Sequence, residues 1–265
     1  PEPHSWYRDI KAIPAGHSVW IENGHMEVPV AWFDIGNIWR EAPKEILTAG
    51  EVQERVRGAL HESVKRHLVS DVPVGVFLSG GIDSGALAGL MTELGPRHIE
   101  GVTIAYDEFT GTHQDEAPVA EAIAAHYGIH HHVRRVTREE FIADLPSILD
   151  AMDQPSIDGI NTWYASKAVA ERGLKVVVSG VGGDELFQGY GTFQTLPRMV
   201  ENWQRLCRIP GVQAAGRIAG GLQAKRSGNA RWRHAAEWAQ TMGGAWWLRR
   251  SLYAPEDLPA LMGKE

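Results

Sequence analysis

Cysteine is nearly absent from this 265-residue sequence: Cys207 is the only one, so no disulfide within the chain can stabilise the fold. A single cysteine fits a cytoplasmic setting. The chain also lacks an excess of basic residues, with 26 Lys and Arg against 33 Asp and Glu and a formal net charge of -7. A general nucleic-acid binder needs a basic face, so we expect no nucleic-acid partner. No stretch approaches 18 uninterrupted apolar residues, which argues against a transmembrane helix and a membrane partner.

Recognisable boundary signals are missing from both ends of the chain. It begins at Pro1 with no initiating Met and no signal peptide, and it ends at Glu265 within no recognisable motif. We therefore expect a piece of a longer polypeptide. Hydrophobic residues make up 43% and charged residues 22% of the sequence, which is ordinary for a globular protein. The length allows one large domain, or one domain that carries part of another.

The first 45 residues or so are predicted to be β-structure and loop. Asn23-Gly24 is a hairpin turn signal, and the flanking segments 18–21 and 25–28 are typical of short strands. A linker with Pro43 follows. This segment is too short for a hydrophobic core of its own, so we expect an arm packed on the main domain.

From about residue 50 onward, helical and strand patterns alternate. Such alternation predicts βαβ units, and so an α/β fold with a doubly wound parallel sheet and helices on both faces. After about residue 190 the strand patterns stop, which predicts a helical C-terminal extension. The expected helices are 52–68, 85–94, 117–127, 139–152 and 162–172, and the expected strands are 72–78, 99–106, 132–136 and 175–178.

The first Gly-rich loop, Ser79-Gly80-Gly81-Ile82-Asp83-Ser84, directly follows an apolar strand and opens a helix. Glycines let the backbone wrap closely round a ligand, and a helix N-terminus offers N–H groups to phosphates. Asp83 would repel phosphate unless a bridging Mg²⁺ lay between them, and a carboxylate is a natural Mg²⁺ ligand. The loop has no Gly-Lys-Ser/Thr ending, which disfavours a Walker-type NTPase.

The second Gly-rich loop, Ser179-Gly180-Val181-Gly182-Gly183-Asp184-Glu185, also follows an apolar strand. Ligands of open parallel sheets bind beyond the carboxyl ends of the strands. Two such loops can face one cleft, where Asp83 and Asp184 could share one Mg²⁺. The alternative is an ordinary helix start, at which Asp184 and Glu185 complement the helix dipole.

Together these loops resemble the N-type ATP pyrophosphatases, and the segments 70–76 and 179–187 resemble the glutamine-dependent asparagine-synthetase family in particular. The resemblance covers about residues 50 to 195. It implies an adenine-nucleotide-alpha-hydrolase-like sheet, ATP and Mg²⁺ as cofactors, and a small carboxylate as substrate. It further implies an acyl-adenylate intermediate, which ammonia converts to an amide with release of AMP. Residues 46–265 would then be a truncated synthetase domain, and residues 1–45 the end of an N-terminal glutaminase domain of the same polypeptide plus a linker.

The resemblance also implies roles for individual residues. The adenosine and α-phosphate region is expected at Leu78, Ser79, Ile104, Ser179 and Gly180, and pyrophosphate with Mg²⁺ at Gly81, Asp83, Ser84 and Asp184. Gly80 is a further expected nucleotide-binding residue. Asp83 and Asp184 are the expected metal ligands. The expected catalytic residues are Asp83, Ser84, Asp184 and Glu185.

The sequence departs from this family at Val181, where asparagine synthetases carry an acidic residue that assists the attack of ammonia. Valine can neither accept a proton nor hold an ammonium ion, so amidation of a carboxylate other than aspartate stays open. A glutaminase needs an N-terminal cysteine nucleophile, and Cys207 is internal. A second use of the same loops, in tRNA thiolation, GMP synthesis or NAD synthesis, and a nucleotide-binding module without chemistry are the rival hypotheses. A homodimer is also open.

Two further features are interpreted as structural. The run His130-His131-His132 invites a metal hypothesis, but adjacent residues of a strand point to opposite faces, so three in a row chelate poorly. Asp115-Glu116 precedes a helix and could cap it, with a weaker case for a role near the triphosphate.

Overall fold

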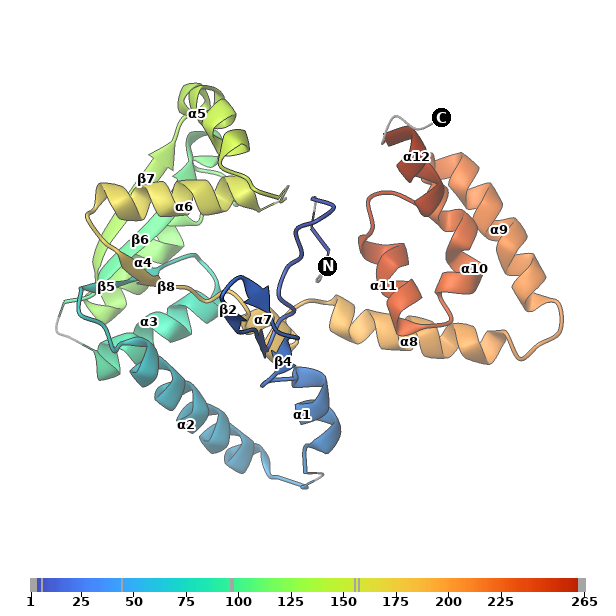
Figure 1. Cartoon of the computed structure of the whole chain (residues 1–265), viewed down its shortest axis with the longest axis horizontal. Helices are drawn as coiled ribbons and strands as arrows, with labels where there is room; N and C mark the ends of the chain where they lie inside the picture. Colours follow the sequence, from blue (N-terminus) through green and yellow to red (C-terminus); the bar gives the residue numbers. More distant parts are fainter. Residues whose placement is uncertain are drawn as a thin grey trace. The chain divides into compact units, whose positions relative to one another are not determined.

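The computed structural model describes residues 4, 5, 7–43, 45–95, 98–154, 156 and 158–261. By their internal contacts they form two units, Pro1–Gly180 and Val181–Glu265. Within the first unit, the strands β5 to β8 form the main sheet (Figure 1).

The main sheet is parallel and has the strand order β7-β6-β5-β8. Its strands are β5 (Val74–Phe77), β6 (Glu100–Tyr106), β7 (His130–Val136) and β8 (Val176–Val178). The chain first moves outward from β5 to β6 and β7, and then returns to place β8 on the other side of β5. The order therefore reverses between β5 and β8, and such a switch point is where open α/β sheets bind ligands.

Helices cover both faces of this sheet. On one face α2 (Ala49–His67), α3 (Ile82–Leu94) and α4 (Ala117–Tyr127) pack together, and α3 and α4 contact the strands. The other face is covered by α5 (Arg138–Asp150) and α6 (Gly159–Glu171), of which α6 contacts β6. The predicted doubly wound α/β class is thus confirmed, with the helices and strands near their expected positions.

Each face of the sheet has its own hydrophobic core. The core under α2, α3 and α4 is built on Val76 of β5 and Met91 of α3, both fully buried. The core under α5 and α6 is built on Val136, Ile148 and Tyr164. Strands with apolar side chains on both faces need this double cover, which is why β5 is nearly continuously apolar.

The N-terminal arm forms two small antiparallel ladders. β2 (Ile21–Glu22) pairs with β3 (His25–Met26) across the predicted Asn23-Gly24 turn, where both residues have positive φ, of 51° and 79°. β1 (His17–Ser18) pairs with β4 (Val30–Ala31). The prediction that the arm contains only strands and loops was wrong in one place, because the arm also contains a helix.

Residues Ile35–Glu41 of the arm form the helix α1. Asp34 caps it, because its side chain accepts from the N–H groups of Gly36 at 2.8 Å and Asn37 at 3.1 Å. An Asp at the N-cap position, followed by a short stretch of mixed apolar and polar residues, is a helix-start signal that the prediction of strands and loops did not take into account.

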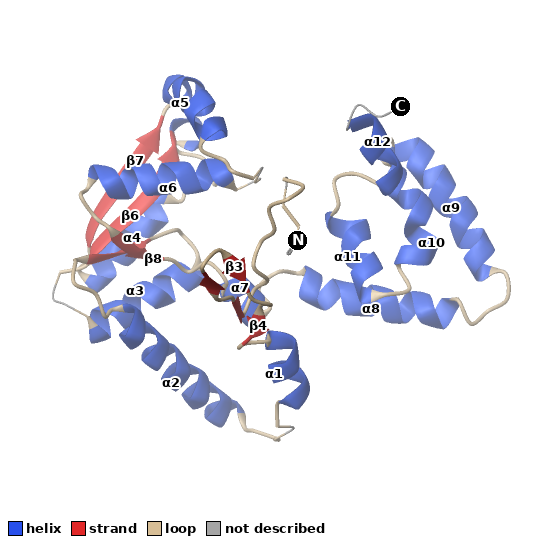
Figure 2. Cartoon of the chain, viewed as in Figure 1, coloured by secondary structure: helices blue, strands red, loops and turns tan. Residues whose placement is uncertain are grey.

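The second unit consists of helices and loops in the part that is described (Figure 2). This confirms the predicted helical C-terminal extension. Trp203 donates from its indole N–H to the carbonyl of Ala236 at 2.9 Å, which ties two of these helices together. The described helices of the second unit are α7 (Gly183–Phe187), α8 (Thr192–Leu206), α9 (Val212–Ser227), α10 (Ala235–Trp238), α11 (Met242–Arg250) and α12 (Leu258–Leu261), with 3-10 turns η2 (Ala230–His234) and η3 (Pro255–Asp257).

Among the described residues, none of the helices combines the length and the apolar character that crossing a membrane requires.

Candidate functional site

The first Gly-rich loop leaves the sheet at Leu78, the residue after β5, and a buried polar pair holds this exit point. The hydroxyl of Thr103, in β6, donates to the carbonyl of Leu78 at 2.6 Å. The hydroxyl oxygen of Thr103 also lies 2.7 Å from Nε2 of His131 in β7. Since the hydroxyl has one proton and gives it to Leu78, the Nε2–H group of His131 donates to Thr103.

This chain of bonds is screened from water. Thr103 is only 2% exposed, and burial lowers the pKa of His131, which favours the neutral imidazole. In that form the bond pattern places the ring proton on Nε2. The three adjacent strands therefore fix the carbonyl from which the loop begins. From the sequence, His131 was considered only as part of the histidine run and Thr103 was not predicted to matter, although a lone hydroxyl inside an apolar strand is a signal for such a bond.

Within the loop, Ser84 bonds to the backbone of its own turn. Its hydroxyl oxygen accepts from the N–H of Ser79 at 3.1 Å and lies 3.1 Å from the carbonyls of Ser79 and Gly81. The hydroxyls of Ser79 and Ser84 are 2.9 Å apart, and Gly81 N–H donates to Ser79 at 3.2 Å. Ser84 is 6% exposed, so its hydroxyl shapes the loop from inside.

The loop opens α3 as predicted, and the start of this helix suits an anion. The N-cap is Gly81, which makes no side-chain capping bond. First-turn N–H groups without a capping side chain carry the positive end of the helix dipole, and they are available to phosphate oxygens. Asp83 lies in this first turn, where a carboxylate beside the phosphates can hold Mg²⁺.

The second Gly-rich loop begins after β8 and meets the first loop at Gly180. A Cβ atom built on Gly180 would lie 3.1 Å from the amide nitrogen of Ser84 and 3.3 Å from the carbonyl carbon of Asp83. The backbones therefore touch at the β5–β8 switch point, and glycine is what allows the approach. The structure thus brings together eight of the predicted residues: Leu78, Ser79, Gly80, Gly81, Asp83, Ser84, Ser179 and Gly180.

Asp184 and Glu185 belong to the second unit, in the first turn of α7. Gly182, the N-cap, has φ 99°, a conformation that glycine adopts without strain. The side chain of Asp184 lies against Gly189, where a Cβ atom would collide with its carboxylate. Glu185 accepts a 3.1 Å hydrogen bond from the hydroxyl of Tyr190, and this bond raises the pKa of the tyrosine.

Ile104 lies in β6, opposite Arg134 of β7, and its side chain packs against the core under α5 and α6. The ladder between β5 and β6 ends at the pair Phe77–Val102, and β6 runs four residues further, to Tyr106. The predicted contact of Ile104 with adenosine is consequently more suited to its backbone than to its side chain.

Asp115 and Glu116 lie just before α4, at the same end of the sheet. Glu116 accepts from the N–H of Gly80 at 3.4 Å, which connects it to the first loop. Asp115 accepts from the N–H of Ala117, the first residue of α4, at 3.3 Å, and from Arg135 at 3.2 Å. The N-cap position itself is Glu116, whose side chain makes no capping bond. Burial alone would raise the pKa of Asp115, but its hydrogen bonds outweigh it and leave the pKa below its usual value.

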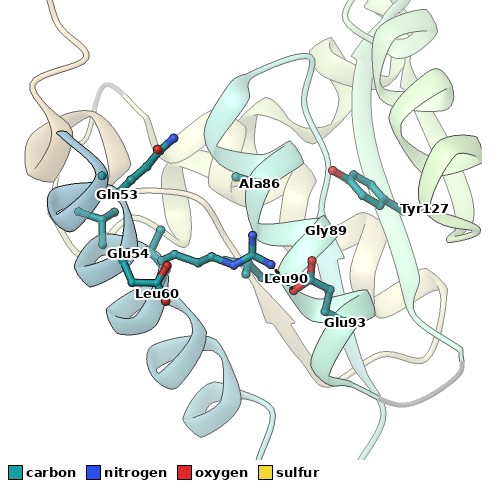
Figure 3. Close-up of a pocket in the computed structure, with 11 residues that line it drawn as sticks. Gln53, Glu54, Leu60, Ala86, Gly89, Leu90, Glu93 and Tyr127 are labelled. Carbon is teal, nitrogen blue, oxygen red and sulfur yellow. Dashed lines mark hydrogen bonds and ion pairs between the residues drawn. The ribbon is translucent and has the colours of Figure 1, made fainter.

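A groove of about 590 Å³ runs between α2 and α3 (Figure 3). Figure 3 shows Gln53 and Glu54 of α2 on one side and Gly89 of α3 on the other. Its wall also contains the ion pair of Arg57 with Glu93, at 3.5 Å. None of the residues predicted to bind the nucleotide lines this groove, so we place the candidate site at the loops instead.

Fold and site together define the chain as an α/β protein with two Gly-rich loops at the switch point of a parallel sheet. The asparagine synthase family matches residues 55–261, and the chain belongs to this family. Asparagine synthetase B of Escherichia coli is 31% identical over 208 residues, which cover 73% of this chain and 36% of that protein. Amidase chry2 of Gibberella zeae is 32% identical over 166 residues, which cover 57% of this chain and 24% of that protein.

The chain therefore spans about a third or less of the length of these relatives. Among solved structures, the ammonia-dependent NAD synthetase of Campylobacter jejuni is similar over 52% of this chain and 60% of that one. It has a TM-score of 0.37 and 16% sequence identity.

Proposed function

We propose that this chain is the ATP-dependent, amide-forming part of an asparagine-synthetase-like ligase. The observation that carries the proposal is the contact of Gly180 with the Asp83–Ser84 backbone at the β5–β8 switch point. It joins two Gly-rich loops beside an N-terminus of α3 that has no side-chain cap. Such a cradle suits the β- and γ-phosphates of ATP.

The residues of this cradle fit a mechanism in which pyrophosphate is the leaving group. The loop N–H groups and the start of α3 hold the β- and γ-phosphates, which leaves the α-phosphorus open to a carboxylate oxygen. Attack there forms an acyl-adenylate and breaks the bond to pyrophosphate. Ammonia then displaces AMP and yields the amide. Asp83 would hold Mg²⁺, and Asp184 is the second metal ligand that the sequence predicts. The ion would stabilise charge on the departing pyrophosphate.

The source of ammonia is proposed to be glutamine, hydrolysed by a glutaminase domain of the same polypeptide. Support comes from the arm, where none of the described residues from 4 to 43 is buried. Large apolar side chains such as Trp20, Val28 and Trp32 are 70% or more exposed there. Apolar surface of this kind usually meets another protein surface, so we assign residues 1–45 to the end of that domain and its linker.

A second candidate is the amidation of a carboxylate other than aspartate. Val181 favours it, because a valine cannot serve as a general base for incoming ammonia. The similarity to a protein named an amidase, and not an asparagine synthetase, supports this candidate.

The proposal is tested with the full-length polypeptide, ATP, Mg²⁺, ammonia and a panel of acids that includes aspartate. We expect AMP and pyrophosphate in equal amounts, because the first loop lacks a Walker lysine; stoichiometric ADP would overturn the mechanism. Asp83→Asn should weaken Mg²⁺·ATP binding sharply in calorimetry. Asp71→Asn removes an exposed carboxylate before β5 and should leave the affinity unchanged. Equal affinities of the two variants would remove Asp83 from the site.

A further inference from the structure

Three potential metal ligands meet at the amino-terminal edge of the main sheet. Glu100 is the first residue of β6, and its register partner in β7 is His130, the first residue of that strand. Residues two apart on a strand point to the same face, so His132 joins them. The parallel register thus gathers one carboxylate and two imidazoles from two neighbouring strands.

The three side chains point at one another. Nδ1 of His130 lies 2.9 Å from one carboxylate oxygen of Glu100, and Nε2 of His132 lies 2.8 Å from the other. One ligand atom from each residue can be chosen so that all lie within 4.8 Å of one another. The two imidazole rings meet edge to face, with centroids 4.5 Å apart.

From this cluster we propose that Glu100, His130 and His132 bind a divalent transition-metal ion of the zinc type. Imidazole nitrogen and carboxylate oxygen are the ligands that zinc takes alongside thiolate, whereas Mg²⁺ and Ca²⁺ prefer oxygen alone. Zinc–ligand distances of about 2.0–2.1 Å place tetrahedral ligand atoms about 3.3 Å apart. The two hydrogen-bonded contacts need to open by a few tenths of an ångström, the more widely spaced ligand atoms, which lie within 4.8 Å, need to move closer, and water completes the set.

Arg172 competes with the metal for His132. Its Nη2 atom lies 2.9 Å from the same Nε2 that faces Glu100. One imidazole nitrogen carries either a proton or a lone pair, so it satisfies the carboxylate or the guanidinium but not both. Arg172 is exposed at the end of α6 and can swing away. Its positive charge opposes a bound cation, so its removal should strengthen metal binding.

His131 does not belong to the cluster, as the argument from strand geometry predicted for three consecutive histidines. It points to the opposite face, toward Thr103. The place of Glu100 beside β7 follows only from the strand pairing. The Gly-rich loops follow the carboxyl ends of β5 and β8, so this cluster, at the amino ends of β6 and β7, is separate from them. A bound ion links β6 to β7.

The test is a zinc titration of the metal-free chain in competition with a chromophoric chelator, without nucleotide. The wild type should bind one equivalent with an affinity above that of its other histidines. His130→Gln and Glu100→Gln should each weaken it by at least about tenfold, since even losing a group that only orients a ligand typically costs about 10- to 100-fold. His130 has a 64% exposed side chain, so its variant should fold normally, as circular dichroism can verify.

Two further variants sharpen the test. His131→Gln changes the middle histidine of the same run and should keep the site, whereas Arg172→Ala should bind zinc more tightly than the wild type. Cobalt(II) in place of zinc should give a visible absorption band in the wild type and in His131→Gln, and lose it in His130→Gln. Equal zinc affinity of the wild type and His130→Gln, or weaker binding by Arg172→Ala, would overturn the proposal.

Discussion

The hydroxyl of Thr103 donates to the carbonyl oxygen of Leu78 over 2.6 Å, so the interior of β6 holds the residue from which the first Gly-rich loop departs. We predict that Thr103→Val destabilises the fold by about 1–3 kcal/mol, the typical cost of leaving a buried acceptor without its donor. Urea unfolding measures this, and the affinity for Mg²⁺·ATP should fall as well. Thr103→Ser keeps the hydroxyl and should retain most of both properties; equal losses in the two variants would contradict the role of the bond.

The close approach of Gly180 to the Asp83–Ser84 backbone leads to a second prediction. In Gly180→Ala the new methyl group would press on the amide of Ser84 at 3.1 Å and separate the two loops. We expect Mg²⁺·ATP binding about tenfold weaker or more, since overpacking typically costs about 1–3 kcal/mol.

The matched control for this change is Gly58→Ala in α2, where a Cβ atom meets nothing within 4 Å. It should leave nucleotide affinity unchanged and slightly stabilise the helix. If Gly180→Ala binds Mg²⁺·ATP as the wild type does, the two loops do not form one nucleotide site.

A third prediction concerns pH and Glu140. Arg134 and Lys167 donate hydrogen bonds to its carboxylate and hold its pKa at about 2, against an ordinary value of 4.5. A depressed pKa in the folded state means that this stabilisation is complete above the unfolded value. It is lost as the pH falls from about 4.5 toward about 2.

We therefore expect the free energy of unfolding of the wild type to drop across this window, and Glu140→Gln to show a smaller drop from a lower starting value at neutral pH. Urea unfolding at several pH values gives both quantities. Glu139→Gln alters the exposed neighbour and should follow the wild-type curve. Parallel curves for Glu140→Gln and the wild type would show that the ion pairs contribute nothing to acid stability.

The fourth prediction concerns Val181, which is 91% exposed in the second loop. General-base help to ammonia is typically worth about 10² to 10⁴ in rate, and valine cannot give it. We predict that the full-length protein forms asparagine from aspartate, ATP and ammonia much more slowly than it amidates its own substrate. Asparagine production at an ordinary enzymatic rate of about 1 to 10³ per second would show that another carboxylate, such as Glu185, takes over the role.

The sequence by itself determined the α/β class, the order of helices and strands from α2 to β8, the helical C-terminal part and the position of both Gly-rich loops after apolar strands. These features follow from local patterns: apolar runs, helical periodicity and glycines at strand ends act over neighbouring residues. The helix α1 was missed because its seven residues are too few for a clear period, and the Asp34 cap was its main signal.

Only the tertiary structure decided which distant side chains meet. Strand order and register placed Thr103 against Leu78, Gly180 against Asp83, and Glu100 beside His130 and His132. Register depends on how whole strands and their covering helices pack, and a shift by one residue would turn every side chain to the other face. For that reason the sequence could predict that consecutive histidines of the run point to opposite faces of the strand. That Glu100 completes the cluster became visible only in the folded sheet.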